Sequence, residues 1–327
     1  MGAKFILFFT GALLAFHAQG QNTEPLTDDA SRADLFSLMI EYAQGASSPA
    51  EKQLYAYPLA FKFPHDALWK HPVLQQSPRL DQVFGIDLSH HNVDNCKCIV
   101  DWPLLRKQEV RYAYLKASQG VRYVDPEYHS YRKGAKALPT DMMIHIGAYH
   151  FLTASGDPIA QARNFLAYIG KAVAVDDLPP ALDLEWDTRT GPDRKWILGP
   201  DGKKLDHWTG IAGQEIIRRA IVWLKAVEKA TGRRPIVYTN GEWWKQRIGN
   251  ENRISDFAGY GVWIADYSKT GRAVEVPFVP SKAPWKLWQF TANGQLRDGG
   301  IGRGASVDAS VFNGTHLQFL SAMGVEQ

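Results

Sequence analysis

The sequence predicts an α/β fold built around an irregular barrel of eight strands. Short apolar runs alternate with helical patterns over much of the chain after residue 83, and this alternation is typical of a parallel sheet with helical crossovers. Little helical pattern separates the last three runs, so the second part of the barrel is expected to be irregular. Acidic and aromatic residues recur where the runs end, which is the edge where barrels of this type place their chemistry.

The expected elements follow from hydrophobic periodicity and from breaker residues. Helices are expected near 126–137, at 158–170 and at 211–231, and Gly232 provides a stop for the last of these. The expected strands are 83–89, 112–118, 143–151, 181–186, 235–239, 262–267, 286–291 and 306–311.

Residues 1–20 have the features of a secretory signal peptide. Lys4 provides the positive start, residues 5–16 are largely apolar, and Ala18-Gln19-Gly20 fits a cleavage site between small residues. The apolar stretch is short for a membrane span, although an uncleaved anchor is the alternative. We therefore expect a secreted or periplasmic protein with no stable membrane insertion after signal cleavage.

Residues 21–82 form an N-terminal extension or linker whose role the sequence does not indicate. Residues 28–44 have helix-like apolar spacing, and a stretch without clear periodicity follows the breaker-rich segment 45–49. The barrel domain is expected to occupy residues 83–327.

The overall charge and the cysteines limit the classes of function. The formal net charge is +3, and no cluster of Lys and Arg suggests a nucleic-acid partner. The two cysteines, Cys96 and Cys98, fit a tight loop disulfide or two free thiols, and two sulfur ligands alone are weak evidence for zinc. We expect no catalytic role for them, and the sequence does not predict an oligomeric state.

Two acids at the end of the fourth predicted strand are the most informative feature of the chain. Asp183 and Glu185 alternate with Leu182, Leu184 and Trp186, so in a strand both carboxyl groups share one face, with Cα atoms about 6.5 Å apart. Two carboxylates in an otherwise apolar strand are costly unless they serve a purpose. Glycosidases use such a pair, one protonated to donate to the leaving oxygen and one ionised to stabilise positive charge.

The ordered strand-end motifs of this chain resemble the family 25 glycoside hydrolases, the lysozyme-like N-acetylmuramidases. The resemblance covers about 84–312 and is carried by Gly85-Ile86-Asp87-Leu88-Ser89-His90-His91, Asp101-Trp102, Tyr114-Leu115-Lys116-Ala117-Ser118-Gln119-Gly120, Gly147-Ala148-Tyr149-His150-Phe151, Leu182-Asp183-Leu184-Glu185, Trp263-Ile264-Ala265-Asp266-Tyr267 and Trp288-Gln289-Phe290. It implies a flattened TIM-like barrel, (β/α)5 followed by three further strands. It also implies cleavage of the β-1,4 bond between N-acetylmuramic acid and N-acetylglucosamine in peptidoglycan.

The resemblance assigns roles to individual residues. Glu185 matches the general acid, and Asp183 matches the carboxylate that assists at the anomeric centre. Asp87 and Asp308 match the further acids of the site, and Tyr149 matches the tyrosine that lines the cleft. Burial and the neighbouring acids would raise the pKa of Glu185. Asp183 could orient the substrate's acetamido group or attack directly, and inversion through water is the third possibility.

The chain departs from the family pattern in three places: the extension before residue 84, the Cys96-Lys97-Cys98 insert and the polar loop 189–204. The loop follows the catalytic strand, so it bears on substrate specificity.

Two further groups of residues are candidates for the site. Adjacent histidines on a strand end point in opposite directions, so at most one of His90 and His91 is expected to face the centre, and no metal or other cofactor is predicted. Trp263 shares a face with Tyr267 and is expected to contact substrate, whereas Trp285 and Trp288 are expected in the core.

Two alternative functions fit the same polymer. One is a metal-dependent peptidoglycan deacetylase or amidase, which would release acetate or peptide without new reducing ends. The other is a non-catalytic glycan-binding barrel, and the presence of both Asp183 and Glu185 argues against it.

Overall fold

The computed structural model describes residues 61–68, 82–94, 96–170, 173–174, 176–188, 197–200, 205–267, 276–302 and 306–325. The predicted signal segment, most of the extension and most of loop 189–204 lie outside these ranges. Among the described residues, no helix combines the length and the hydropathy that crossing a membrane requires.

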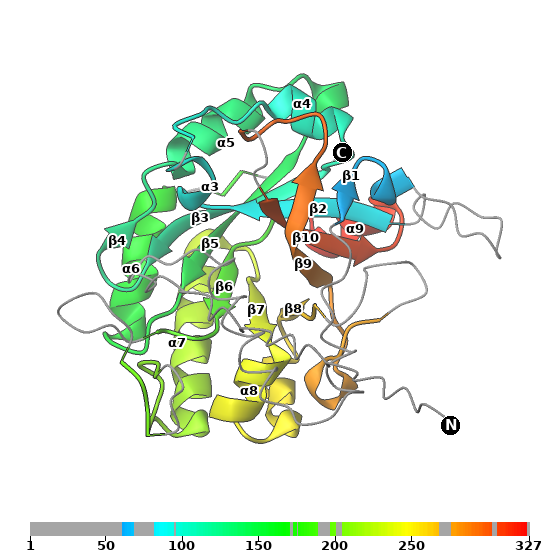
Figure 1. Cartoon of the computed structure of the whole chain (residues 1–327). Coiled ribbons are helices and arrows are strands. Elements are labelled where there is room, and N and C mark those ends of the chain that lie inside the picture. Colours follow the sequence, from blue (N-terminus) through cyan, green and yellow to red (C-terminus); the bar gives the residue numbers. More distant parts are fainter. Residues whose placement is uncertain are drawn as a thin grey trace, which may run out of the picture.

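Eight strands form a closed barrel, as the sequence predicts (Figure 1). The first seven run parallel to one another, and the eighth is antiparallel to both of its neighbours and closes the barrel. In order around the barrel they are β2 (Gln82–Leu88), β3 (Tyr112–Gln119), β5 (His145–Phe151), β6 (Ala181–Leu184), β7 (Ile236–Asn240), β8 (Gly261–Ala265), β9 (Leu287–Leu296) and β10 (Ser306–Asn313). Two short strands pair with the ends of barrel strands, β1 (Lys62–Phe63) with β9 and β4 (Tyr123–Val124) with β3.

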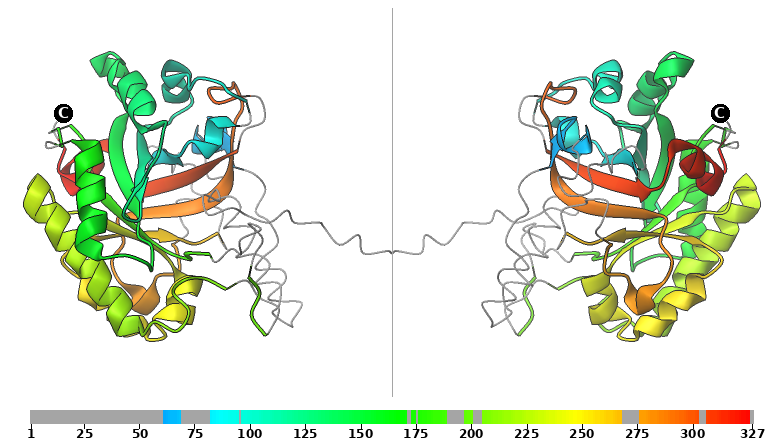
Figure 2. Two further views of the ribbon diagram at one scale, coloured as in Figure 1. Left: turned by 90° about the vertical axis from the view of Figure 1, so that its left-hand side faces the viewer. Right: turned by 90° about the vertical axis from the view of Figure 1, so that its right-hand side faces the viewer.

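Helices follow each of the strands β2, β3, β5, β6 and β7 and cover the outside of this part of the barrel, whereas β9 and β10 lie on the less covered side (Figure 2). The α-helices are α3 (His91–Asp94), α4 (Trp102–Lys107), α5 (Tyr128–Lys136), α6 (Pro158–Ile169), α7 (Gly213–Thr231), α8 (Gly241–Arg247) and α9 (His316–Met323). The 3-10 helices are η1 (Asp66–Leu68), η3 (Thr140–Met142), η4 (Glu251–Phe257) and η5 (Pro280–Lys282). Because α3 and α8 are so short, the expected (β/α)5 arrangement holds only approximately.

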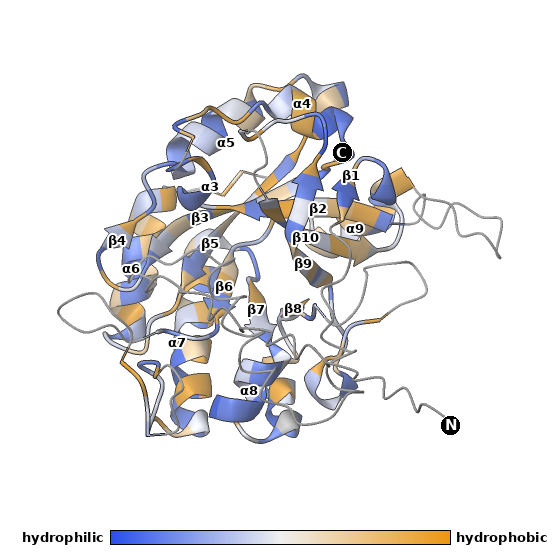
Figure 3. Cartoon of the chain, in the orientation of Figure 1, coloured by the Kyte–Doolittle hydropathy of each residue, from blue (hydrophilic) through white to orange (hydrophobic). Residues whose placement is uncertain are grey.

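The three predicted helices α5, α6 and α7 are confirmed, and local chemistry sets their ends. Asp157 caps α6 by accepting from the backbone N–H of Ala160. Gly232 ends α7 with a left-handed backbone conformation, as the sequence predicts. Hydrophobic and hydrophilic residues alternate along α7 (Figure 3), and its apolar residues are buried against the barrel.

The buried residues form two clusters, one inside the barrel and one between the strands and the helices. The large rings Tyr112, Tyr114, Tyr238 and Trp263 belong to the inner cluster. Helix α9 contributes Phe319 to this cluster, and its ring stacks on Tyr112 at 5.0 Å between centroids. The interior is therefore filled at the end where the parallel strands begin, and the polar side chains lie at the other end.

Two glycines of the strand motifs are required by this packing. A Cβ atom on Gly85 would clash with the ring of Tyr112, and one on Gly147 would clash with the ring of Tyr114. Both rings are completely buried and cannot move aside. The glycines therefore make room for the aromatic layer beneath the strand ends.

Part of the predicted extension packs directly on the barrel. The backbone N–H of Gln295 on β9 donates to the carbonyl of Phe61 at 2.6 Å, and β1 adds to the same strand. The rings of Phe61 and Phe63 are buried, and Phe61 lies 5.3 Å from Phe84 and 4.8 Å from Phe290 between centroids. Residues 61–68 thus contribute to the outer core, while the domain boundary near residue 83 stays a prediction.

Candidate active site

The structure buries both acids of the fourth predicted strand at the carboxyl end of β6. Asp183 is 1% exposed and Glu185 is 2% exposed. Leu182, Leu184 and Trp186 belong to the outer cluster that packs against the helices. Because strand residues alternate between faces, the two acids lie on the opposite face, toward the barrel interior. The strand itself ends at Leu184, two residues earlier than predicted.

Two further predicted acids meet across the neighbouring strands β2 and β10. Asp87 and Asp308 are directly opposite each other in the antiparallel register, and both side chains are buried. Residues paired in this way have Cβ atoms about 4.5–5.5 Å apart. The end of the barrel therefore carries buried carboxyl groups from three of its strands.

Gln289 on β9 holds Asp87 in place, and it is not among the site residues that the sequence predicts. Its Nε2 donates to Asp87 Oδ2 at 2.7 Å, and its Oε1 accepts from the hydroxyl of Tyr238 at 2.8 Å and from that of Tyr267. Gln289 itself is fully buried. The signal was present, because Gln289 is the one polar residue in Trp288-Gln289-Phe290, whose rings belong to the outer cluster.

Lys116 places a cation at the same level of the barrel. It lies opposite Tyr149 in the register between β3 and β5, and its side chain is largely buried. Its Nζ donates to Gln119 Oε1 at 2.8 Å and lies 5.4 Å from the centre of the Phe151 ring. The oxygen of Gln119 and the face of the Phe151 ring therefore stabilise this buried ammonium group. Lys116 falls within a family-like motif, but it was not predicted as a site residue.

The two predicted aromatic site residues have different surroundings. Tyr149 is buried in the inner cluster and pairs with Ala181 on β6, two residues before Asp183. Trp263 is also buried, between the rings of Tyr114 at 4.9 Å and Tyr238 at 5.0 Å, and its Nε1 donates to Ser310 Oγ. Trp263 is thus part of the aromatic layer in this structure, and its contact with substrate stays a prediction.

Backbone hydrogen bonds fix the segment that carries the two central acids. The N–H of Leu152 donates to the carbonyl of Asp183 at 2.9 Å, and Trp208 Nε1 donates to the carbonyl of Glu185 at 3.0 Å. Trp208 is completely buried. These contacts hold the chain just after β6 in one conformation, although regular strand structure has ended there.

The expectation that His90 and His91 point in opposite directions is wrong. The chain leaves β2 after Leu88 and turns into α3, so the two residues are not on an extended strand. Their rings lie 3.9 Å apart between centroids, and both face Asp94. Burial lowers the pKa of His90, but the hydrogen bond and negative charge of Asp125, together with Asp94, outweigh burial and raise it.

Two other features lie apart from the acids. Cys96 and Cys98 form a disulfide, which decides between the two predicted states.

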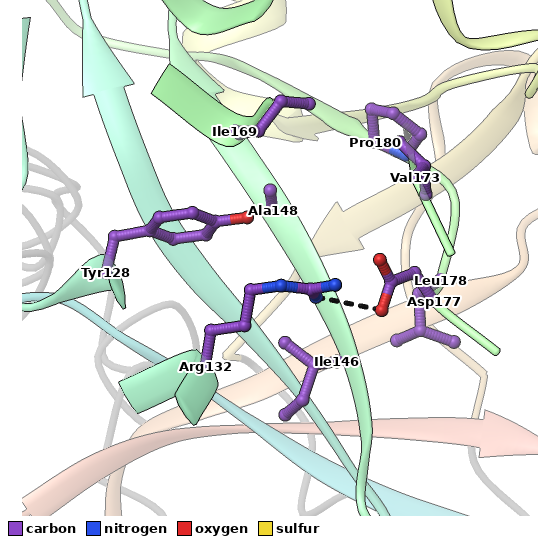
Figure 4. A pocket seen from close by; sticks show the side chains of 9 residues that line it. All are labelled: Tyr128, Arg132, Ile146, Ala148, Ile169, Val173, Asp177, Leu178 and Pro180. Atoms are coloured by element: carbon purple, nitrogen blue, oxygen red, sulfur yellow. Dashed lines mark hydrogen bonds and ion pairs between the residues drawn. The ribbon is translucent and has the colours of Figure 1, made fainter. Parts of the chain in front are cut away.

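A pocket outside the barrel wall is lined by Tyr128, Arg132, Ile146 and six further residues (Figure 4). Within this pocket Arg132 Nη1 forms an ion pair with Asp177 Oδ1 at 2.8 Å, so these two charged side chains have a structural role.

Comparisons with known proteins agree with this geometry. The family model described as Glycosyl hydrolases family 25 matches residues 86–299. Lysozyme M1 of Streptomyces globisporus is 26% identical over 242 residues, which are 73% of this chain and 70% of that protein. N,O-diacetylmuramidase of Chalaropsis sp is 30% identical over 149 residues, which are 43% of this chain and 61% of that protein. The bacterial lysozyme structure from Streptomyces coelicolor has a TM-score of 0.57 and 26% identity, and the match covers 74% of this chain and 97% of that chain.

Proposed function

Since the chain belongs to the family 25 glycosyl hydrolases, it is a glycoside hydrolase, and we propose that Glu185 and Asp183 carry out its reaction on peptidoglycan. The relatives named lysozyme and muramidase support cleavage of the β-1,4 bond between N-acetylmuramic acid and N-acetylglucosamine. The observation that carries the proposal is the group of buried acids, Asp87, Asp183, Glu185 and Asp308, at the end of the barrel where the parallel strands finish.

Glu185 is the proton donor in this proposal. Its surroundings are nearly closed to solvent and contain other acids, and both conditions favour the neutral, protonated form of a carboxyl group. A protonated carboxyl can donate to the glycosidic oxygen as the bond to the leaving sugar breaks. The hydrogen bond from Trp208 to its backbone fixes where the donor sits.

Asp183 acts at the anomeric carbon, and three mechanisms are compatible with its position: substrate-assisted attack, direct attack by Asp183, and inversion through water. The 2-acetamido carbonyl of the substrate can attack while Asp183 orients the amide, or Asp183 can attack directly. A carboxyl separation of about 5–5.5 Å is typical of retaining enzymes with a protein nucleophile, and about 6.5–9.5 Å of inverting enzymes. The stereochemistry of the product, read by NMR in the first minutes of reaction, separates inversion from the two retaining routes.

Asp87 and Asp308 support the positive charge that develops on the sugar ring. Gln289 keeps the Asp87 carboxylate in a fixed orientation through its 2.7 Å hydrogen bond. A fixed carboxylate needs no reorganisation when charge develops in the transition state, which is the general basis of electrostatic catalysis. Tyr149, one strand away from Asp183, is proposed to line the substrate side of the group.

Glu185→Gln tests the assignment of the proton donor. The amide keeps the size of the side chain but cannot donate the required proton, so we expect release of reducing ends from purified peptidoglycan to fall about 10²- to 10⁴-fold. The exposed Glu242→Gln is the matched control and should keep full activity. Circular dichroism of both variants establishes that they are folded. Full activity in folded Glu185→Gln would contradict the assignment.

We also propose that residues 1–20 direct export and are removed, which would place the enzyme outside the cytoplasm. Its relatives support an extracellular or cell-wall-acting enzyme. N-terminal sequencing of the exported protein would locate the cleavage site. The predicted absence of nucleic-acid binding and of membrane insertion, and the division into an extension and a barrel at residues 82 and 83, stay predictions.

A further inference from the structure

Three side chains just after β2 converge on one point outside the group of acids. His90 Nε2 lies 3.5 Å from Asp94 Oδ2, and His91 Nδ1 lies 3.6 Å from the same oxygen. The three potential ligand atoms all lie within 4.8 Å of one another. We propose that His90, His91 and Asp94 bind a divalent transition-metal ion, with Zn²⁺ as the first candidate.

The spacing of the three atoms suits a metal of this size. Zinc lies about 2.0–2.2 Å from imidazole nitrogen and carboxylate oxygen in tetrahedral sites, so two of its ligand atoms are separated by roughly 3.3–3.5 Å. The two distances to Asp94 are already close to this value. The side chain of Asp94 is 45% exposed, so a small rotation of its carboxylate can complete the geometry. Three protein ligands leave a fourth position for water.

The hydrogen bonding of His90 directs the required lone pair toward the proposed metal. Asp125 is completely buried, and its Oδ2 lies 2.8 Å from His90 Nδ1 and 3.1 Å from the backbone N–H of His90. A carboxylate oxygen only accepts, so Nδ1 is the protonated nitrogen of the ring. Nε2 of a neutral ring then carries the lone pair, on the side of Asp94. Metal-binding histidines commonly have such a carboxylate behind them.

The chemistry of the donors favours zinc-like ions over magnesium or calcium. Imidazole nitrogen suits Zn²⁺, Cu²⁺ and Ni²⁺, whereas Mg²⁺ and Ca²⁺ prefer oxygen ligands. Lys97 approaches the other oxygen of Asp94, Oδ1, at 3.9 Å and leaves Oδ2 to the proposed metal. Cys96 and Cys98 are joined to each other and offer no thiolate. The negative charges of Asp94 and Asp125 favour a cation beside His90, whereas the positive charge of Lys116 opposes it. Lys116 donates to Gln119 Oε1.

The proposed ion would tie the turn after β2 to helix α3. Asp87 lies three residues before His90, so a metal here would hold the strand end that carries one of the site acids. This role is structural and does not depend on the proposed glycosidase reaction. A doubly protonated His90 between Asp94 and Asp125, with no metal, is the alternative arrangement.

Zinc binding by the untagged full-length chain tests the proposal. The protein is stripped with a chelator, dialysed against buffered Zn²⁺, and analysed for metal by mass spectrometry and by isothermal titration calorimetry. We expect about one Zn²⁺ per chain. Loss of a supporting carboxylate typically weakens metal sites about 10–100-fold, so loss of a ligand in His91→Ala or Asp94→Asn should weaken binding at least about 100-fold.

His65→Ala is the matched control, because His65 is an exposed histidine that contacts a neighbouring aspartate at 2.7 Å. It should bind zinc as the unchanged chain does. His91 and Asp94 are partly exposed, and unchanged circular dichroism will show that their variants fold. Absence of zinc binding, or equal binding in the unchanged chain and both ligand variants, would overturn the proposal. Loss of binding in the two variants alone would support it.

Discussion

Gln289 offers the sharpest test of how the site is held together. In Gln289→Leu, Asp87 loses a 2.7 Å hydrogen bond and Tyr238 loses the acceptor of its hydroxyl group. A hydrogen bond to a charged group contributes about 1.5–3 kcal/mol, and removal of one partner of a buried hydrogen bond costs about 1–3 kcal/mol. Leucine is similar in size to glutamine, so no large cavity adds to this. We expect the free energy of unfolding to fall by about 3–5 kcal/mol.

The same variant should also slow catalysis, because Asp87 is no longer fixed. A displacement of about 1 Å in a catalytic group can lower the rate about 100-fold. Urea denaturation gives the stability, and reducing-end release at saturating peptidoglycan gives kcat. Gln295→Leu, an exposed position on the same strand, is the control and should change neither quantity. Gln289→Glu should recover activity as the pH falls, because a protonated Glu can again donate to Asp87. Unchanged kcat in Gln289→Leu would refute this role for Gln289.

Two further predictions concern stability. Phe63→Ala should lower the free energy of unfolding, measured by urea denaturation, by about 3–5 kcal/mol, because Phe63 is fully buried. Leu68→Ala, at an exposed position, is the control and should change it little. Equal effects of the two substitutions would mean that residues 61–68 do not pack as described. Burial lowers the pKa of His145 to about 4 and that of His150 to about 3, so below about pH 6.5 the unfolded chain binds more protons at both positions. Stability should therefore fall between pH 6.5 and pH 5, by about 3 kcal/mol for the two together. The pH slope should be shallower in His150→Asn, and a flat profile would contradict the buried, neutral state.

The strands and long helices could be predicted from the sequence because their hydrophobic periodicity extends over more than one helical turn or one pair of strand residues. Helix α7 has an apolar face over nineteen residues and ends at Gly232. Both the periodicity and the glycine stop depend only on residues close together in the chain. The four-residue α3 is too short for periodicity to appear, so the sequence pattern continues the preceding strand through His90 and His91. The turn that brings them together depends on the buried Asp125, which lies 35 residues away in the chain.

The central acids could be predicted because strand alternation alone places Asp183 and Glu185 on one face. The role of Gln289 could not be inferred in this way. It depends on β9 closing the barrel wall against β8 and β10, which brings Gln289 to Asp87, 202 residues away in the chain. A lone amide between two aromatic residues marks Gln289 as unusual, but it does not indicate which residue the amide contacts. The active site of a barrel is assembled from many strands, and the sequence of a single strand shows only the residues that this strand contributes.

The identity of the new sugar end decides most directly whether this chain is a muramidase. Purified peptidoglycan is digested with the enzyme and with Glu185→Gln, the products are reduced with borohydride, and the fragments are identified by mass spectrometry. We predict fragments that end in reduced N-acetylmuramic acid with the unchanged enzyme, and at most traces of them with the variant. Fragments that end in reduced N-acetylglucosamine, or release of acetate or peptides without new reducing ends, would contradict the proposed reaction.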